Sequence, residues 1–82
     1  MYTIYDDDAV TAAVATMPRE LLDHYAELRA ALEVSPRTVG RPLRALNPDG
    51  LRSADTAGGR ILLVFGVIER DRRVDLLQLT IF

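Results

Sequence analysis

The last third of the chain constrains the fold most, because it holds two apolar segments joined by a short charged turn. Residues 60–69 read RILLVFGVIE, and residues 73–82 read RVDLLQLTIF after the turn at residues 70–72. Strand-forming side chains on both sides of a tight turn predict an antiparallel β-hairpin. The apolar run at residues 61–65 is uninterrupted, whereas a strand with one solvated face alternates apolar and polar residues. Helices can cover one face of this hairpin, and we expect a further surface to cover the other.

The first residues predict a short strand that leads into a helix. YTIY at residues 2–5 alternates β-branched and aromatic side chains, which is typical of a strand. Asp6, Asp7 and Asp8 follow, and aspartates at a helix start accept hydrogen bonds from free amides and complement the helix dipole. A magnesium or calcium site is the alternative interpretation, but loops that bind these ions space their carboxylates as D-x-D-x-D. We therefore assign the three aspartates to helix capping.

Two helices are expected between residues 9 and 34. The first has an apolar face made of Val10, Ala13, Val14 and Met17. Pro18 stands where the second helix begins, at a position that needs no amide donor. The second helix carries an apolar stripe at helical spacing, formed by Leu21, Tyr25, Leu28 and Leu32. This stripe predicts packing of the helix against a sheet.

Residues 35–50 lack a periodic pattern and contain three of the four prolines. NPDG at residues 47–50 predicts a type I turn. Because long structureless segments are uncommon in compact domains, this one is either functional or held to the core by Val39, Leu43 and Leu46.

The remaining segments complete the expected topology. Residues 51–56 predict a weak, fairly polar strand near a sheet edge, and residues 57–59 predict a turn. The order is then β-α-α-β-β-β, an α+β fold in which a four-stranded antiparallel sheet packs on a two-helix hairpin. We expect residues 1–82 to form a single domain, the size at which one small core is normal.

Composition argues against several classes of protein. The chain has no cysteine, one histidine and no glycine-rich phosphate loop, which argues against a classical hydrolase or a metalloenzyme. We expect neither a metal nor a cofactor. No run of about 18 apolar residues exists, and the N-terminal MYTIYDDD is acidic where a secretory signal is basic. These features predict a soluble cytoplasmic protein with no membrane partner.

Charge is distributed unevenly along the chain. The net charge is −2, residues 1–34 hold seven acidic and two basic side chains, and residues 35–82 hold eight basic and five acidic ones. All ten basic residues are arginine. The second half can therefore meet anionic groups, although the overall balance is far from that of a strongly basic nucleic-acid binder.

Several motifs along nearly the whole chain resemble the RelE/ParE toxin superfamily. Residues 16–18 (Thr-Met-Pro) look like the break between that family's two helices. Gly40-Arg41-Pro42-Leu43 looks like its loop motif G-x-P-L, and residues 60–65 (RILLVF) are similar to the strand usually written Y-R-v-v-Y. The resemblance implies the toxin of a bacterial type II toxin–antitoxin pair, neutralised by a cognate antitoxin. RelE-like members cleave mRNA on the ribosome without a metal, and ParE-like members poison DNA gyrase.

The resemblance also implies site residues. Arg60 matches the basic residue that begins the family's third strand, and Arg52 falls on the second strand, where cations that contact RNA are common. We predict catalytic roles for Arg52 and Arg60, since a guanidinium stays charged and matches phosphate oxygens. Arg70, Arg72 and Arg73 are candidate binding residues, and solvation of the hairpin is the alternative for these three. The alternative for Arg52 and Arg60 is that both are solvated residues at a strand edge.

The end of the last strand keeps a second function open. RelE-like nucleases usually carry an Arg, His or Tyr near this point, and the chain reads Leu79-Thr80-Ile81-Phe82. None of these side chains transfers a proton. The alternative hypothesis is a non-catalytic interaction domain of the same architecture that forms a homodimer through its second apolar sheet face.

Overall fold

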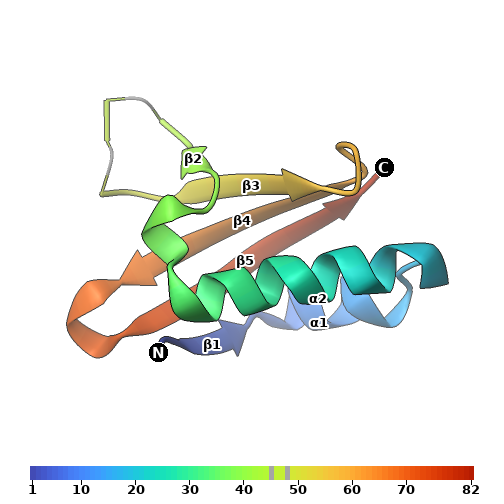
Figure 1. Cartoon of the computed structure of the whole chain (residues 1–82), viewed down its shortest axis with the longest axis horizontal. Coiled ribbons are helices and arrows are strands. Elements are labelled where there is room, and N and C mark those ends of the chain that lie inside the picture. The colour runs from blue at the N-terminus through green and yellow to red at the C-terminus, as the bar shows by residue number, and fades with distance from the viewer. Residues whose placement is uncertain (45, 48) are drawn as a thin grey trace.

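The computed structural model describes residues 1–44, 46, 47 and 49–82. It contains two helices and one five-stranded sheet of order β1-β5-β4-β3-β2, which Figure 1 shows from the side of the longer helix. The elements are β1 (Thr3–Asp6), α1 (Asp8–Ala15), α2 (Arg19–Val34), β2 (Arg41–Pro42), β3 (Arg52–Thr56), β4 (Ile61–Ile68) and β5 (Arg73–Ile81). Two 3₁₀ turns complete the list, η1 (Pro36–Thr38) and η2 (Glu69–Asp71).

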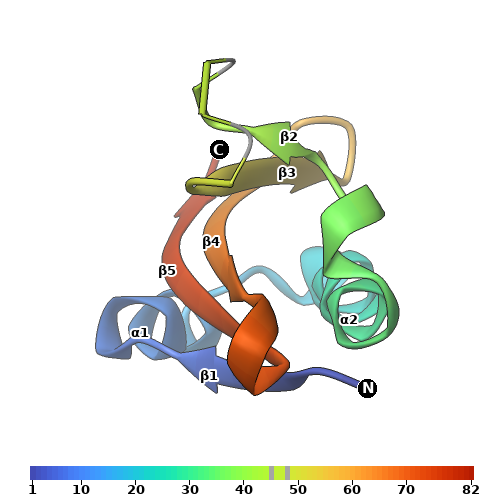
Figure 2. The same ribbon diagram turned by 90° about the vertical axis from the view of Figure 1, so that its left-hand side faces the viewer.

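The helical hairpin forms where the sequence predicts it. Asp7 is the N-cap of α1, and its side chain accepts a hydrogen bond from the Ala9 amide at 3.1 Å. Pro18 is the N-cap of α2 and its carbonyl accepts from the Leu21 amide at 2.9 Å. The predicted stripe on α2 is buried, with Leu32 wholly inaccessible to solvent. Figure 2 shows α2 lying inside the curve of the sheet and α1 near its β1–β5 end.

The predicted four-stranded antiparallel sheet is wrong, because the sheet is mixed and has five strands. β1 runs parallel to β5, in a register that pairs Thr3 with Arg73 and Asp6 with Leu76. Tight turns force β3, β4 and β5 to alternate in direction, whereas β1 joins from outside this meander through the helical hairpin. No short turn therefore fixes its direction.

The fifth strand, β2, lies in the segment that the sequence assigns to a loop. It has only two residues and pairs with Arg52 and Ser53, and the Leu43 amide continues the ladder by donating to the Leu51 carbonyl at 2.8 Å. Proline has no backbone N–H to donate to a neighbouring strand. Pro42 is tolerated because β2 lies at the edge of the sheet, with a neighbouring strand on one side only. Position 48 of the predicted NPDG turn lies outside the described residues, while the Gly50 amide donates to the Asn47 carbonyl at 3.1 Å.

Only one of the three proposed loop anchors holds the 35–50 segment to the core. Val39 is partly buried and packs against the core cluster. Leu43 is half exposed and Leu46 is 99 % exposed, so neither serves as an anchor. Polar contacts of Arg37 and Arg52 replace them, as described below.

A β-bulge explains why β5 has apolar residues at both even and odd positions. Val64 pairs with Gln78 and Phe65 pairs with Leu76, so Leu77 has no partner. The extra residue reverses the side-chain alternation. Val74, Leu76 and Leu79 consequently all point into the core, and Leu77 is left 38 % exposed on the opposite face.

The two sheet faces therefore differ more than the sequence predicts. The face toward the helices buries Ile61, Leu63 and Phe65 completely. On the other face Leu62 and Val64 are only partly buried. Figure 2 shows α2 on the inner side of the curved sheet and no helix outside β3 and β4. This helix-free face is the one available to a ligand or partner. None of the helices in the described residues is long and apolar enough to cross a membrane.

Candidate functional site

Arg52, one of the two predicted catalytic arginines, points toward the helix side of the sheet. It is 7 % exposed, and its Nη2 donates to the carbonyls of Val39 (3.1 Å) and Gly40 (3.3 Å). Its Nε is buried without a hydrogen-bond partner among the described residues, and no described carboxylate forms an ion pair with it. The guanidinium thus holds the backbone that enters β2.

Arg60, the other predicted catalytic residue, lies at the far end of the β3–β4 hairpin. Its Nε donates to the Phe82 carbonyl at 3.2 Å, and its Nη1 lies 3.7 Å from a Glu20 carboxylate oxygen. The side chain is 46 % exposed, so the guanidinium can reach solvent. Arg52 pairs with Phe65 while Ile61 pairs with Thr56, four residues along the strand, or about 13 Å. The structure does not bring the two arginines together.

The three hairpin arginines occupy different environments around η2. Arg70 is 88 % exposed, with its Nε 3.7 Å from Asp71. Arg73 donates to Asp75 at 2.7 Å and lies over the Tyr5 ring at 4.3 Å. Arg72 adopts φ 49° at the end of the turn and lies over the Tyr2 ring at 4.6 Å. Arg70 is therefore the hairpin cation that is most available to a partner.

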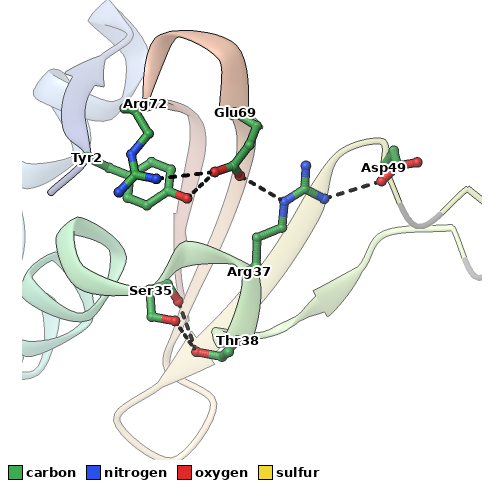
Figure 3. A network of polar contacts seen from close by, with 7 residues as sticks. All are labelled: Tyr2, Ser35, Arg37, Thr38, Asp49, Glu69 and Arg72. Carbon is green, nitrogen blue, oxygen red and sulfur yellow. Dashed lines mark hydrogen bonds and ion pairs between the residues drawn. The ribbon is translucent and has the colours of Figure 1, made fainter.

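A polar network joins this turn to the 35–50 segment (Figure 3). Arg37 bridges two carboxylates, with Nε 3.4 Å from Glu69 and Nη1 3.4 Å from Asp49. The Tyr2 hydroxyl donates to Glu69, and Arg72 approaches the same carboxylate at 3.8 Å. These contacts fasten the N-terminal strand and the loop to the β4–β5 turn, which is a structural role.

The network shifts two pKa values in opposite directions. The hydrogen bond from Tyr2, followed by the contact with Arg37, lowers the pKa of Glu69 below its ordinary value. The same bond, together with burial, raises the pKa of the Tyr2 hydroxyl. The network therefore favours the carboxylate form of Glu69.

The N-terminal aspartates divide between a cap and an ion pair. Asp7 caps α1 as predicted, and Asp8 lies in the first helical turn. Asp6 instead accepts a bidentate pair from Arg29, at 2.6 and 3.1 Å. Nowhere in the described residues do three or more His, Cys, Asp or Glu side chains gather in a way that could hold a metal ion.

A cleft that sequence reasoning missed lies at the β2–β3 edge. It has a volume of about 360 Å³ and is lined by Val39, Gly40, Arg41, Ser53, Ala54, Asp55 and Leu62. Arg41 pairs with Ser53 across the strands, and Asp55 follows two residues later on the same face. Alternation along residues 51–56 places Ser53 and Asp55 on one face of the sheet. The sequence could have revealed the cleft only if Arg41 had been recognised as part of a neighbouring strand.

Gly40 gives the cleft its shape. Its φ of +66° lies in the left-handed region, and a Cβ there would stand 2.0 Å from the Ser53 carbonyl oxygen. Only glycine lets the chain pass so close to β3. This is the physical reason for the glycine in the Gly40-Arg41-Pro42-Leu43 motif.

Comparison with solved structures identifies the fold. A chain of the toxin–antitoxin complex RelBE2 from Mycobacterium tuberculosis is 23% identical with a TM-score of 0.81, covering 99% of this chain and 98% of that one. The intact RelBE toxin–antitoxin complex of E. coli gives 17% identity, a TM-score of 0.83 and coverage of 100% and 98%. The isolated E. coli RelE toxin gives 17% identity and 0.83, with coverage of 99% and 84%. No family model and no curated protein sequence matches the chain.

These likenesses define the class of protein by its fold. The chain has the α+β fold of the RelE toxins, over essentially its full length, as the sequence motifs predict. At these identities the likeness extends to the fold and not to individual site residues.

Proposed function

We propose that this chain is the toxin of a RelBE-type toxin–antitoxin pair and acts in the cytoplasm. The observation that carries the proposal is the near-complete overlap with RelE toxins, two of the compared structures being toxin–antitoxin complexes. The helix-free sheet face, on which Leu62 and Val64 are only partly buried, supplies a surface for an antitoxin. Exposed arginines at several edges suit a polyanionic target.

For the mechanism we propose metal-independent cleavage of mRNA, with the two predicted arginines in different roles. Arg60 is exposed enough to bind a phosphate and to stabilise the negative charge that develops as the ribose 2′-oxygen bonds to phosphorus. The bond to the 5′-oxygen of the next nucleotide then breaks, and water takes the 2′-hydroxyl proton and protonates the leaving oxygen. Arg52 acts by position, because its guanidinium is engaged with the Val39 and Gly40 carbonyls. Arg70, exposed on the β4–β5 turn, adds an electrostatic contact to RNA.

Regulated expression of the chain in a bacterium tests the toxin proposal. Growth should stop on induction, and primer extension should show new 5′ ends within translated mRNA. Arg60→Ala should relieve arrest, whereas Arg19→Ala, an exposed arginine on α2, should not. Phe65→Asp, which places a carboxylate in the core, provides an unfolded control.

The outcomes separate the possible mechanisms. Growth arrest accompanied by DNA damage and intact mRNA would indicate gyrase poisoning as the mechanism and would contradict mRNA cleavage. No arrest by a folded, soluble wild-type chain would contradict the toxin proposal. A neighbouring open reading frame whose product binds the chain and restores growth would supply the antitoxin.

The exposed leucine at the bulge favours a second candidate function, homodimerisation without catalysis. Leu77 and Leu51, 38 % and 43 % exposed, line a groove of about 410 Å³ on the helix-free face. Leu77→Asp should convert a dimer to a monomer in light scattering. Leu22→Asp is the matched control, since Leu22 is 39 % exposed on α2. A wild-type monomer would exclude this function.

A further inference from the structure

The strand β4 contains a glycine that neither its backbone conformation nor crowding explains. Gly66 is not among the glycines with a positive φ. A Cβ at this position would meet only one atom, the Leu51 Cδ2 at 3.4 Å, and the exposed Leu51 side chain can turn aside. Glycine inside a strand weakens it, because the unfolded chain gains freedom and no side chain packs. The bare backbone at Gly66 therefore lowers stability without being required for folding.

The missing side chain leaves a hollow in the groove on the helix-free face. Leu51 and Leu77 both line this groove, and both are exposed. Gly66 pairs with Asp75 across β4 and β5, so Asp75 stands directly beside the hollow. The hollow thus combines aliphatic walls with one carboxylate.

The Asp75 carboxylate has an oxygen left for a partner. Its Oδ1 accepts from Arg73 Nε at 2.7 Å, and its Oδ2 accepts no hydrogen bond from the described residues. The Arg73 guanidinium lies over the Tyr5 ring of β1 at 4.3 Å, and Arg73 is not part of the described lining of the groove. The Asp75 side chain is only 24 % exposed, so its attraction to a cation is screened less than at an open surface.

The charge of the groove selects the kind of ligand. The ionisable residues of its described lining are Asp75 and Asp49, and Arg37 pairs with Asp49 at 3.4 Å from outside the lining. Carboxylates attract a cation and repel a phosphate-rich ligand. A long basic side chain also suits the apolar walls, because its methylene groups pack on apolar surface while its head reaches a charge.

We propose that the hollow over Gly66 receives a lysine or arginine side chain of a protein partner. The aliphatic stem lies between Leu51 and Leu77, and the cationic head donates to Asp75 Oδ2. Such a side chain defines the chemistry of the partner at this face, whichever protein supplies it, and so extends the proposed function without depending on it.

Titration of the full chain with short peptides, followed by amide chemical shifts, tests the site. The probes are acetylated and amidated alanine pentapeptides with lysine, norleucine or glutamate at the centre. The lysine peptide should give saturable shifts at residues 51, 66, 75 and 77. It should bind about tenfold more tightly than the norleucine peptide, which has the same stem without the charge. The glutamate peptide should not bind.

Two variants separate binding from folding. Gly66→Val fills the hollow with a strand-forming side chain, so it should abolish binding of the lysine peptide and raise the urea midpoint of unfolding. Asp75→Asn keeps the shape of the site and should reduce the preference for lysine over norleucine to near unity. The matched control is Asp71→Asn, which removes a half-exposed carboxylate from η2 and should leave binding unchanged.

Several results would overturn the proposal. The first is absence of saturable binding, or equal binding of the lysine and norleucine peptides. A lower unfolding midpoint for Gly66→Val would mean that folding itself requires the glycine. Displacement of the lysine peptide by a single-stranded oligoribonucleotide would place a nucleic acid in the groove. A wild-type dimer that Leu77→Asp dissociates would place a second copy of the chain there.

Growth arrest, measured separately, distinguishes this failure from failure of the proposed function. A chain that arrests growth but binds no lysine peptide would keep the toxin proposal and lose the site over Gly66. A chain that causes no arrest and yet binds the lysine peptide through Asp75 would keep the site while the toxin proposal fails.

Discussion

Replacement of Gly40 by alanine should destabilise the protein far more than the same change at Gly58. Both glycines have φ +66°, so each alanine incurs the same conformational cost, about 1–2 kcal/mol. At Gly58 a new Cβ has no atom within 4 Å, whereas at Gly40 it would stand 2.0 Å from the Ser53 carbonyl oxygen. Relief of that clash requires β2 to move away from β3.

The additional cost at Gly40 follows from the contacts that such a movement breaks. The β2–β3 ladder and the two Arg52 bonds to Val39 and Gly40 would weaken, each bond contributing about 1 kcal/mol. We expect Gly40→Ala to lower the free energy of unfolding by about 3–4 kcal/mol and Gly58→Ala by about 1–2 kcal/mol. A domain of this size has a total stability of roughly 4–12 kcal/mol, so the difference is large.

Urea unfolding followed by circular dichroism measures both variants. The conformational term is common to the two glycines and cancels in their difference, which leaves the steric contact at Ser53. Equal destabilisation by the two substitutions would refute the reasoning that the close approach of Gly40 to β3 supports the edge of the sheet.

Three further predictions concern the buried and networked charges. Arg52→Ala should cost about 2–4 kcal/mol by urea unfolding, because two carbonyls lose their donor and a cavity remains; a loss under 0.5 kcal/mol would contradict this. Arg29→Ala should cost about 0.5–1 kcal/mol by thermal unfolding, since its pair with Asp6 is bidentate but one-third exposed. Because the pKa of Glu69 is lowered by folding, its carboxylate stabilises the folded protein above its ordinary pKa, and this stability is lost as pH falls through the lowered value. The free energy of unfolding of the wild type should therefore fall more between pH 5 and 3 than that of Glu69→Gln. Parallel pH profiles of the two proteins would argue against the Tyr2 contact.

Local patterns predicted the elements well wherever one physical signal dominated. The α2 stripe from Leu21 to Leu32 was readable because four residues repeat at helical spacing, and all four are buried. Helix capping could be predicted for the three aspartates as a group, and Asp7 is the one that forms the cap. The pairing of β4 with β5 followed from the short turn between two apolar runs.

Pairings that depend on tertiary contacts could not be predicted in the same way. The direction of β1 depends on where the helical hairpin delivers the chain, and no local residue encodes it. β2 was hidden by Gly40 and Pro42, which in isolation predict a break. Here Gly40 precedes the strand with a positive φ, and Pro42 lies within the strand at the sheet edge. The burial of Arg52 was also unpredictable, because its partners are backbone carbonyls, which leave no trace in side-chain composition.

The bulge at Leu77 affects how this chain can be compared with its structural relatives. One unpaired residue shifts every later side chain of β5 to the other face, so the strand has two counting frames. If a functional residue is transferred from a relative by counting along β5, the count is correct only on one side of Leu77. Beyond Leu77 the same count exchanges core positions for solvent-facing positions. Alignments through this strand should therefore be anchored on backbone pairs, Phe65 with Leu76 and Val64 with Gln78, and not on sequence letters.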